Sequence, residues 1–362
     1  RAAEKYISDF GSIAPKTPYY LGQYALVVII SKITALSVGL IDKILLPLLE
    51  AVILPPLVFL TLRHGFQMER QSARLGSLLF FLIPFSSFIA TTPNDLANFF
   101  AIALVFFGAL FLTTEHIPWS VPLILILAIL AIHPLIGLPM LAFYLLMMSV
   151  TNFKLLADYQ ELKFGLPAII FLFGASLLPA IFIIFLKADF HWPTLKQIFD
   201  LLTPPALPQL RPKEPFSLWF ALIYYYNYLL PVVALTASAL GGWLIWKNKK
   251  QTTTVLFALS WLALLINIIF LKLVKLPSVI NYEQTDYANR LAHFSFYLIM
   301  PLFLFGLIYF INYLFIKIPA FFVYAGLALL IAAAFYLSYP RVDNYAFSKS
   351  FNVSQNDFDA VR

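Results

Sequence analysis

Residues 292–314 read AHFSFYLIMPLFLFGLIYFINYL, a run of 23 residues without lysine, arginine, aspartate or glutamate. An α-helix needs about 20 predominantly apolar residues to cross the hydrocarbon core of a bilayer. A transmembrane β-strand would show about 10 residues of alternating polarity, and this run does not alternate. The stretch therefore predicts a membrane-spanning helix.

The composition extends this prediction to the whole chain. Of the 362 residues, 62% are hydrophobic and 11% are charged, whereas about 25% of the residues of a soluble globular protein are charged. This deficit excludes a soluble multidomain enzyme, and the apolar content excludes a disordered chain. The chain has no cysteine, which excludes disulfides and cysteine-ligated metals.

Nine further apolar segments lead us to expect an all-α, polytopic transmembrane bundle of about ten spans. In the run 119–150 we expect two short helices that meet at His133-Pro134, although a single kinked helix is the alternative. Residues 21–39 contain Gln23 and Lys32 and fit a helix at the membrane surface. The ten predicted spans are 44–62, 75–91, 97–113, 119–132, 135–150, 164–187, 216–246, 253–274, 292–314 and 318–337.

The basic residues predict the orientation. Short cytoplasmic loops of membrane proteins are enriched in lysine and arginine, and we attribute the net charge of +7 to this bias rather than to nucleic-acid binding. The long segments 1–43, 188–215, 275–291 and 338–362 then lie outside. The basic residues of the short loops are Arg63, Arg70, Arg74, Lys154, Lys163, Lys247, Lys249, Lys250 and Lys317.

Polar residues at the outer rim are candidates for chemistry, and each has a structural alternative. Asp95, after Asn94, could hold a divalent cation or cap the next helix. His133 could contact a phosphate or bind a carbonyl that Pro134 leaves free. Glu50, inside an apolar span, could relay protons or be a neutral structural group.

Arg290 opens a predicted span at the outer rim. Its guanidinium suits a phosphate or diphosphate headgroup, because its fork of donors matches phosphate oxygens. The alternatives are an interfacial anchor or an ion pair with Glu283 or Asp286.

The order of these segments resembles the GT-C superfamily of integral-membrane glycosyltransferases. Tyr19, Tyr20 and Gly22 are similar to a Tyr-Pro-Pro-Gly-Tyr-like motif that closes the first outer loop of those enzymes, although Pro18 stands where the motif opens with tyrosine. Arg290 looks like a late arginine of the family. Residues 1–43 then look like the remnant of a first outer loop with an interfacial helix, 44–337 form the bundle, and 338–362 begin an outer soluble segment.

The resemblance implies transfer of a sugar from a polyprenyl-phosphate donor to a glycan, lipid or protein acceptor, outside a bacterial or archaeal plasma membrane. The donor phosphate would contact Asn94, Asp95, His133 and Arg290, with Mg²⁺ or Mn²⁺ possible on Asp95. Further substrate contacts would come from Lys16, Tyr19, Tyr20, Glu283 and Asp286.

The resemblance also bears on the catalytic base. An acidic base follows the first span in this superfamily, which places it ahead of Arg1, so residues 1–362 alone are expected to be inactive. Asp9 is the aspartate that remains before Pro15, with Glu4 nearby. Two other classes stay open: a transporter or flippase of a lipid or polymer precursor, and an O-antigen-polymerase-like protein of polysaccharide assembly.

Overall fold

The computed structural model describes residues 2–11, 21–83, 91–114, 118–152, 160–186, 218–248, 251–273 and 281–338, and all regular elements in these ranges are helices. A π-helical turn, Thr61–Gly65, continues α3, and a 3-10 turn, Phe80–Leu82, follows α4. The α-helices are α1 (Ala2–Phe10), α2 (Leu21–Thr34), α3 (Val38–Leu60), α4 (Arg70–Leu79), α5 (Pro93–Thr113), α6 (Ser120–Ile132), α7 (Pro134–Asn152), α8 (Gln160–Leu186), α10 (Leu218–Lys247), α11 (Gln251–Leu273), α12 (Asn281–Lys317) and α13 (Ala320–Ser338).

Six helices in the described ranges are long and apolar enough to cross a membrane. They are α3 with its π-helical turn, α5, α10, α11, α12 and α13. Shorter apolar stretches lie in α2, α6, α7 and α8. The chain is therefore an all-helical, multi-pass membrane protein, while crossings by the other predicted segments stay predictions.

Two predicted spans differ from the helices found. The segment predicted at 75–91 begins inside α4, which is amphipathic: Ala73 and Leu79 are buried, and Arg70 and Arg74 are exposed. Residues 84–90 lie outside the described ranges. The 13 residues of α6 reach only about 20 Å, which is less than the bilayer core of about 30 Å. The break at His133 is confirmed, because α6 ends at Ile132 and α7 begins at Pro134.

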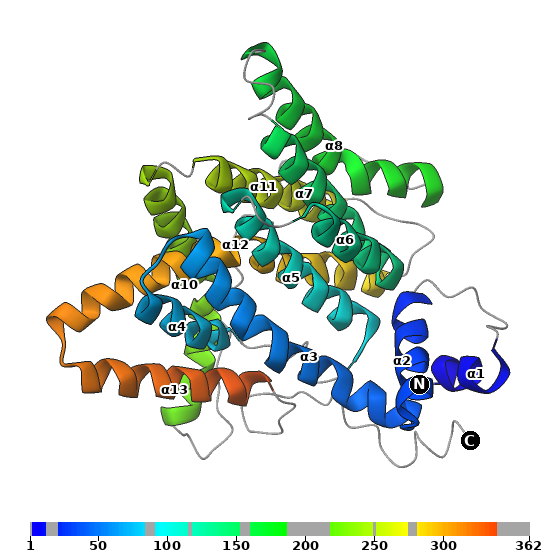
Figure 1. Cartoon of the computed structure of the whole chain (residues 1–362), viewed down its shortest axis with the longest axis horizontal. Coiled ribbons are helices and arrows are strands. Elements are labelled where there is room, and N and C mark those ends of the chain that lie inside the picture. The colour runs from blue at the N-terminus through cyan, green and yellow to red at the C-terminus, as the bar shows by residue number, and fades with distance from the viewer. Residues whose placement is uncertain are drawn as a thin grey trace.

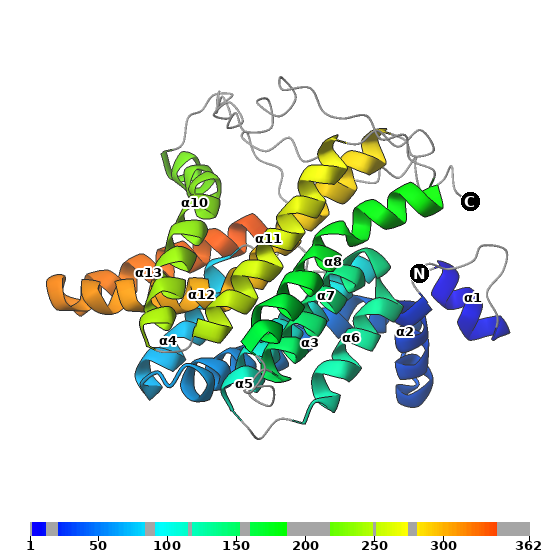
Figure 2. The ribbon, with the colours of Figure 1, turned by 90° about the horizontal axis from the view of Figure 1, so that it is seen from above.

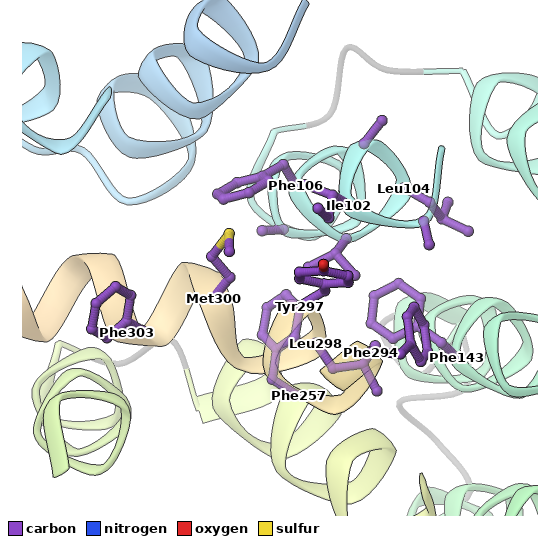
Figure 3. Packing of buried hydrophobic residues seen from close by; sticks show 14 of the residues in the cluster. Ile102, Leu104, Phe106, Phe143, Phe257, Phe294, Tyr297, Leu298, Met300 and Phe303 are labelled. Carbon is purple, nitrogen blue, oxygen red and sulfur yellow. The ribbon is translucent and has the colours of Figure 1, made fainter. Parts of the chain in front are cut away.

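The core lies where α5, α7, α11 and α12 meet. In the most apolar stretch of each helix, 83% of the residues in α12 and 72% of those in α5 are buried, against 17% of those in α13. These values place α5 and α12 in the interior and expose α13 to lipid. Figure 3 shows Phe143, Phe257, Phe294 and Tyr297 pointing toward one another between these four helices.

Helices α10 and α12 cross with their backbones in contact. A Cβ added to Gly241 would lie 1.9 Å from the carbonyl oxygen of Leu302, and one added to Gly306 would lie 2.0 Å from that of Ala237. Any side chain larger than hydrogen would push the helices apart. Ala237 and Gly241 are four residues apart on α10, the small-residue spacing that allows close helix packing in membranes.

A buried amide joins α11 to α8. The side chain of Asn267 accepts a hydrogen bond from the Leu178 amide (3.2 Å) and donates to the carbonyl of Gly174 (2.9 Å) and to that of Ala263 (2.7 Å). Gly174 and Leu178 are the two residues that one α-helical hydrogen bond would join. Asn267 therefore bonds both the carbonyl and the amide that would otherwise pair in this turn of α8, which directly precedes Pro179.

Candidate functional site

Figures 1 and 2 show α1 and α2 at one end of the bundle, opposite the turn between α12 and α13. Elements at the end with α1 and α2 carry a group of buried and half-buried polar side chains. We call this group the amino-terminal polar cluster. Its members come from α1, α2, the start of α5 and the junction of α6 with α7. They are Glu4, Gln23, Thr91, Asn94, Asn98 and His133.

The carboxylate of Glu4 is held inside the protein. Both Glu4 and Gln23 are 1% exposed. The Gln23 amide donates to Oε1 of Glu4 at 2.5 Å, with a longer contact of 3.4 Å to the carbonyl oxygen of Thr91. The first bond orients the carboxylate. The two together link α1, through Gln23 of α2, to Thr91, which precedes the start of α5.

Thr91 attaches the start of α5 to α3. Its backbone amide donates to the carbonyl of Asp42 (3.1 Å), and its hydroxyl accepts from the amide of Leu46 (3.1 Å). Asp42 and Leu46 are again the two ends of one helical hydrogen bond, directly before Pro47. The polar cluster therefore sits on a fixed contact between two helices.

Asp95 caps the start of α5 together with Thr92, which is one of the two alternatives expected for a carboxylate at this position; the other is a cation ligand. The Asp95 amide donates to Oγ1 of Thr92 (3.2 Å), and the Thr92 hydroxyl donates back to the Asp95 carboxylate at 2.5 Å. The Asn94 amide donates to the other carboxylate oxygen at 3.2 Å. This is a reciprocal cap of the kind that satisfies the free amides at a helix start.

The predicted Mg²⁺ or Mn²⁺ on Asp95 has little support in this geometry. Both carboxylate oxygens of Asp95 already accept local hydrogen bonds. Within the described residues, no group of three or more His, Cys, Asp or Glu side chains could hold a metal ion. Asp95 therefore forms a helix cap in this structure, and a divalent cation on it stays a prediction.

Three side-chain amide oxygens of the cluster are acceptors without a donor among the described residues. Gln23 Oε1, Asn94 Oδ1 and Asn98 Oδ1 are buried and have no hydrogen-bond partner in the part of the chain that the structure describes. Asn94 and Asn98 are four residues apart and so share one face of α5. An unmet buried acceptor costs about 1–3 kcal/mol, so these oxygens are suited to donors such as water or a ligand hydroxyl.

His133 is a neutral member of the cluster. Its burial, followed by the positive charge of Arg290, lowers its pKa from 6.5 to about 4. The structure thus brings together these two predicted site residues, which are far apart in the sequence. Gly22 allows α2 to pack closely against the last turn of α6, because a Cβ at this position would lie 2.8 Å from the backbone of Ala131.

The remaining predicted site residues are placed as follows. Asp9 is exposed on α1, and Arg290 is exposed on α12. Glu283 and Asp286 belong to α12, but their side chains lie outside the described part of the structure. The predicted substrate contacts Lys16, Tyr19 and Tyr20 also lie outside the described ranges.

Gln23 and Asn98 are not among the site residues predicted from the sequence, and Glu4 is predicted only as a neighbour of Asp9. Asn98 carries a usable signal, because it is the one polar residue in the run 97–112. Glu4 carries none, since its nine-residue helix is polar and its burial depends on contact with α2.

Comparison of the chain with protein-family models, with curated proteins and with solved structures finds no match. The resemblance to the GT-C superfamily therefore stays a prediction that rests on the residues named above.

Proposed function

We propose that the protein is a membrane glycosyltransferase that moves a sugar from a polyprenyl-phosphate donor to an acceptor at the amino-terminal polar cluster. The observation that carries the proposal is the buried, oriented carboxylate of Glu4 beside the open amide acceptors of Gln23, Asn94 and Asn98. A carboxylate is suited to take a proton from an acceptor hydroxyl. Amide oxygens are suited to sugar hydroxyls, which are donors.

The reaction would need few groups. A carboxylate removes the proton of the acceptor hydroxyl, and the oxygen attacks the anomeric carbon of the sugar. The bond from that carbon to the phosphate oxygen breaks, and the polyprenyl phosphate leaves with the electron pair. Within residues 1–362 Glu4 is the better base candidate, because it is buried and oriented, whereas Asp9 is exposed. Assigning the base to Glu4 departs from the family pattern, which places it ahead of Arg1, and transfer by residues 1–362 alone would distinguish the two assignments.

Arg290 would stabilise the leaving phosphate. Its guanidinium is permanently charged, exposed and close enough to His133 to affect the pKa of that side chain. The neutral imidazole of His133 would add a hydrogen bond without adding charge. Electrostatic stabilisation of a developing anion by fixed donors is a large contribution in group transfer.

The position of the basic residues supports placing this chemistry outside the cell. Arg63 lies in the π-helical turn that continues α3, Arg70 and Arg74 lie on α4, and Lys317 ends α12. Figure 1 shows α4 and the turn between α12 and α13 at the end of the bundle opposite α1 and α2. By the bias of cytoplasmic loops toward lysine and arginine, that end faces the cytoplasm. The polar cluster then faces outward, as we expect in a bacterial or archaeal plasma membrane.

The test is transfer of ¹⁴C-labelled sugar from undecaprenyl-phosphate glucose, mannose or arabinose in membrane vesicles that contain the protein and its acceptors. We expect Glu4→Gln to reduce transfer by about 100-fold or more, the usual contribution of a general base, and Arg290→Ala to reduce it as well. Asp9→Asn tests the alternative base. Arg70→Ala, at the other end of the bundle, is the control and should leave transfer unchanged.

Unchanged transfer in Glu4→Gln, Asp9→Asn and Arg290→Ala would show that the site is wrong. The transporter alternative rests on Glu50, a half-buried carboxylate in α3 between Pro47 and Pro55. Proton-coupled uptake of a lipid or polymer precursor into proteoliposomes, lost in Glu50→Gln, would favour that alternative over ours.

A further inference from the structure

We propose that a cavity at the basic end of the bundle binds the headgroup of an anionic phospholipid. The cavity lies between α4, the end of α12 and the start of α13, which are neighbours in both views of the fold (Figures 1 and 2). Its volume is about 580 Å³, within the range of small-molecule sites. It is separate from the amino-terminal polar cluster.

The lining of the cavity combines a cation with neutral hydrogen-bonding groups. Arg74 and Ser72 enter from α4, Asn312 from α12 and Tyr324 from α13. The Asn312 amide donates to the Ser72 hydroxyl at 3.1 Å, which joins two of the walls. Arg74 makes no hydrogen bond or ion pair with the residues that the structure describes. Its guanidinium is therefore available to a phosphate, which it can bind with two parallel hydrogen bonds.

The apolar surroundings favour a lipid over a soluble anion. Leu75, Leu78 and Phe315 line the same cavity as Arg74. A second cavity of about 230 Å³, lined only by apolar residues of α12, α13 and their turn, lies on the same helix pair and includes Leu314 and Phe322. A headgroup on the polar side and an acyl chain on the apolar side would match this arrangement.

The local charge also favours an anion. Arg63, Arg70 and Arg74 outnumber Glu69 in the 63–74 segment, and Lys317 ends α12 beside the turn. Basic pockets between transmembrane helices on the cytoplasmic side are suited to anionic headgroups. Glu69 lines the cavity as well and should weaken the binding of a phosphate.

The experiment is native mass spectrometry of the purified protein with equal amounts of phosphatidylglycerol and phosphatidylcholine of the same acyl chains. We expect retention of phosphatidylglycerol over phosphatidylcholine. Arg74→Gln should reduce this preference about tenfold, the effect of losing one charge-assisted hydrogen bond. Arg70→Gln is the matched control: it removes an exposed arginine of the same helix that does not line the cavity.

Glu69→Gln provides a change in the opposite direction, because it removes the negative charge of the lining and should raise the preference. This result does not depend on how well Arg74→Gln folds. Equal retention of the two lipids, or an unchanged preference in both Arg74→Gln and Glu69→Gln, would overturn the proposal. Displacement of phosphatidylglycerol by an equal concentration of inorganic phosphate or glycerophosphoglycerol would also overturn it, since the site would then be one for a soluble anion.

Discussion

At the scale of single residues, the candidate site is determined by which polar groups are buried and how they are bonded. Asp95 and Glu4 are both carboxylates at the same end of the bundle, yet they differ in role. Asp95 binds its neighbours Thr92 and Asn94 and closes a helix cap. Glu4 is bonded to Gln23 across two helices. The first arrangement is local to one helix start, whereas the second joins two helices.

His133 gives a prediction on pH. Its pKa is lowered from 6.5 to about 4 in the folded protein, so between these values the unfolded chain binds a proton that the folded protein does not. The free energy of unfolding should therefore fall as the pH drops from about 6.5 to 4, by up to about 3 kcal/mol. Thermal unfolding in detergent measures this dependence.

His133→Gln should remove that part of the pH dependence, because glutamine does not titrate. His64→Gln is the control, since His64 is an exposed histidine of the π-helical turn. Identical pH profiles for the wild-type protein and His133→Gln would contradict the assignment of a buried neutral imidazole.

At the scale of helices, two interhelical contacts described above use the turn before a proline. Thr91 binds the carbonyl of Asp42 and the amide of Leu46 before Pro47, and Asn267 binds Gly174 and Leu178 before Pro179. Polar groups of one helix that bind the backbone of another are worth about 0.6–2 kcal/mol inside a membrane. The contact between α10 and α12 uses glycine instead.

Gly241→Ala and Gly306→Ala should each destabilise the protein. The added methyl would meet a carbonyl oxygen at about 2 Å, and such overpacking costs about 1–3 kcal/mol or more. We expect a lower melting temperature in detergent for both variants. Gly326→Ala is the matched control, because Gly326 is also inside a helix and a Cβ there meets nothing within 4 Å.

Alanine has the higher helix propensity, so Gly326→Ala should leave the stability unchanged or raise it by up to about 1 kcal/mol. If Gly241→Ala and Gly306→Ala behaved like Gly326→Ala, helices α10 and α12 would not cross as closely as described.

At the scale of the whole molecule, the bundle has two chemically different ends. One end carries buried polar groups around Glu4, and the other carries exposed arginines around α4. The proposed sugar transfer and the proposed lipid site therefore lie at opposite ends. Both orientations in the membrane are compatible with the helices, and the distribution of basic residues predicts that the end with the arginines faces the cytoplasm.

The natural absence of cysteine makes this orientation directly testable with single-cysteine variants. A membrane-impermeant maleimide should label Lys5→Cys in intact cells, because Lys5 is exposed beside the polar cluster on α1. Arg70→Cys should be labelled only after the membrane is permeabilised. The reverse pattern would place the polar cluster in the cytoplasm and contradict sugar transfer on the outer face.

The sequence alone determines the helical, membrane-embedded class of this protein, the break at His133-Pro134 and the position of the basic loops. These properties are local: hydropathy along the chain, a proline after a helix end and charges in short segments. The cap formed by Thr92 and Asp95 is equally local, and it was one of the two readings that the sequence left open.

Only the tertiary structure decides that Glu4 is buried against Gln23, that Arg290 acts on His133, and that Gly241 lies against α12. Each of these contacts joins helices that are separate in the chain, so it depends on how the helices rotate and tilt against one another. Long apolar runs contain little of that information, because nearly every face of such a helix is apolar. The few polar and small residues on those faces determine which face meets which neighbour.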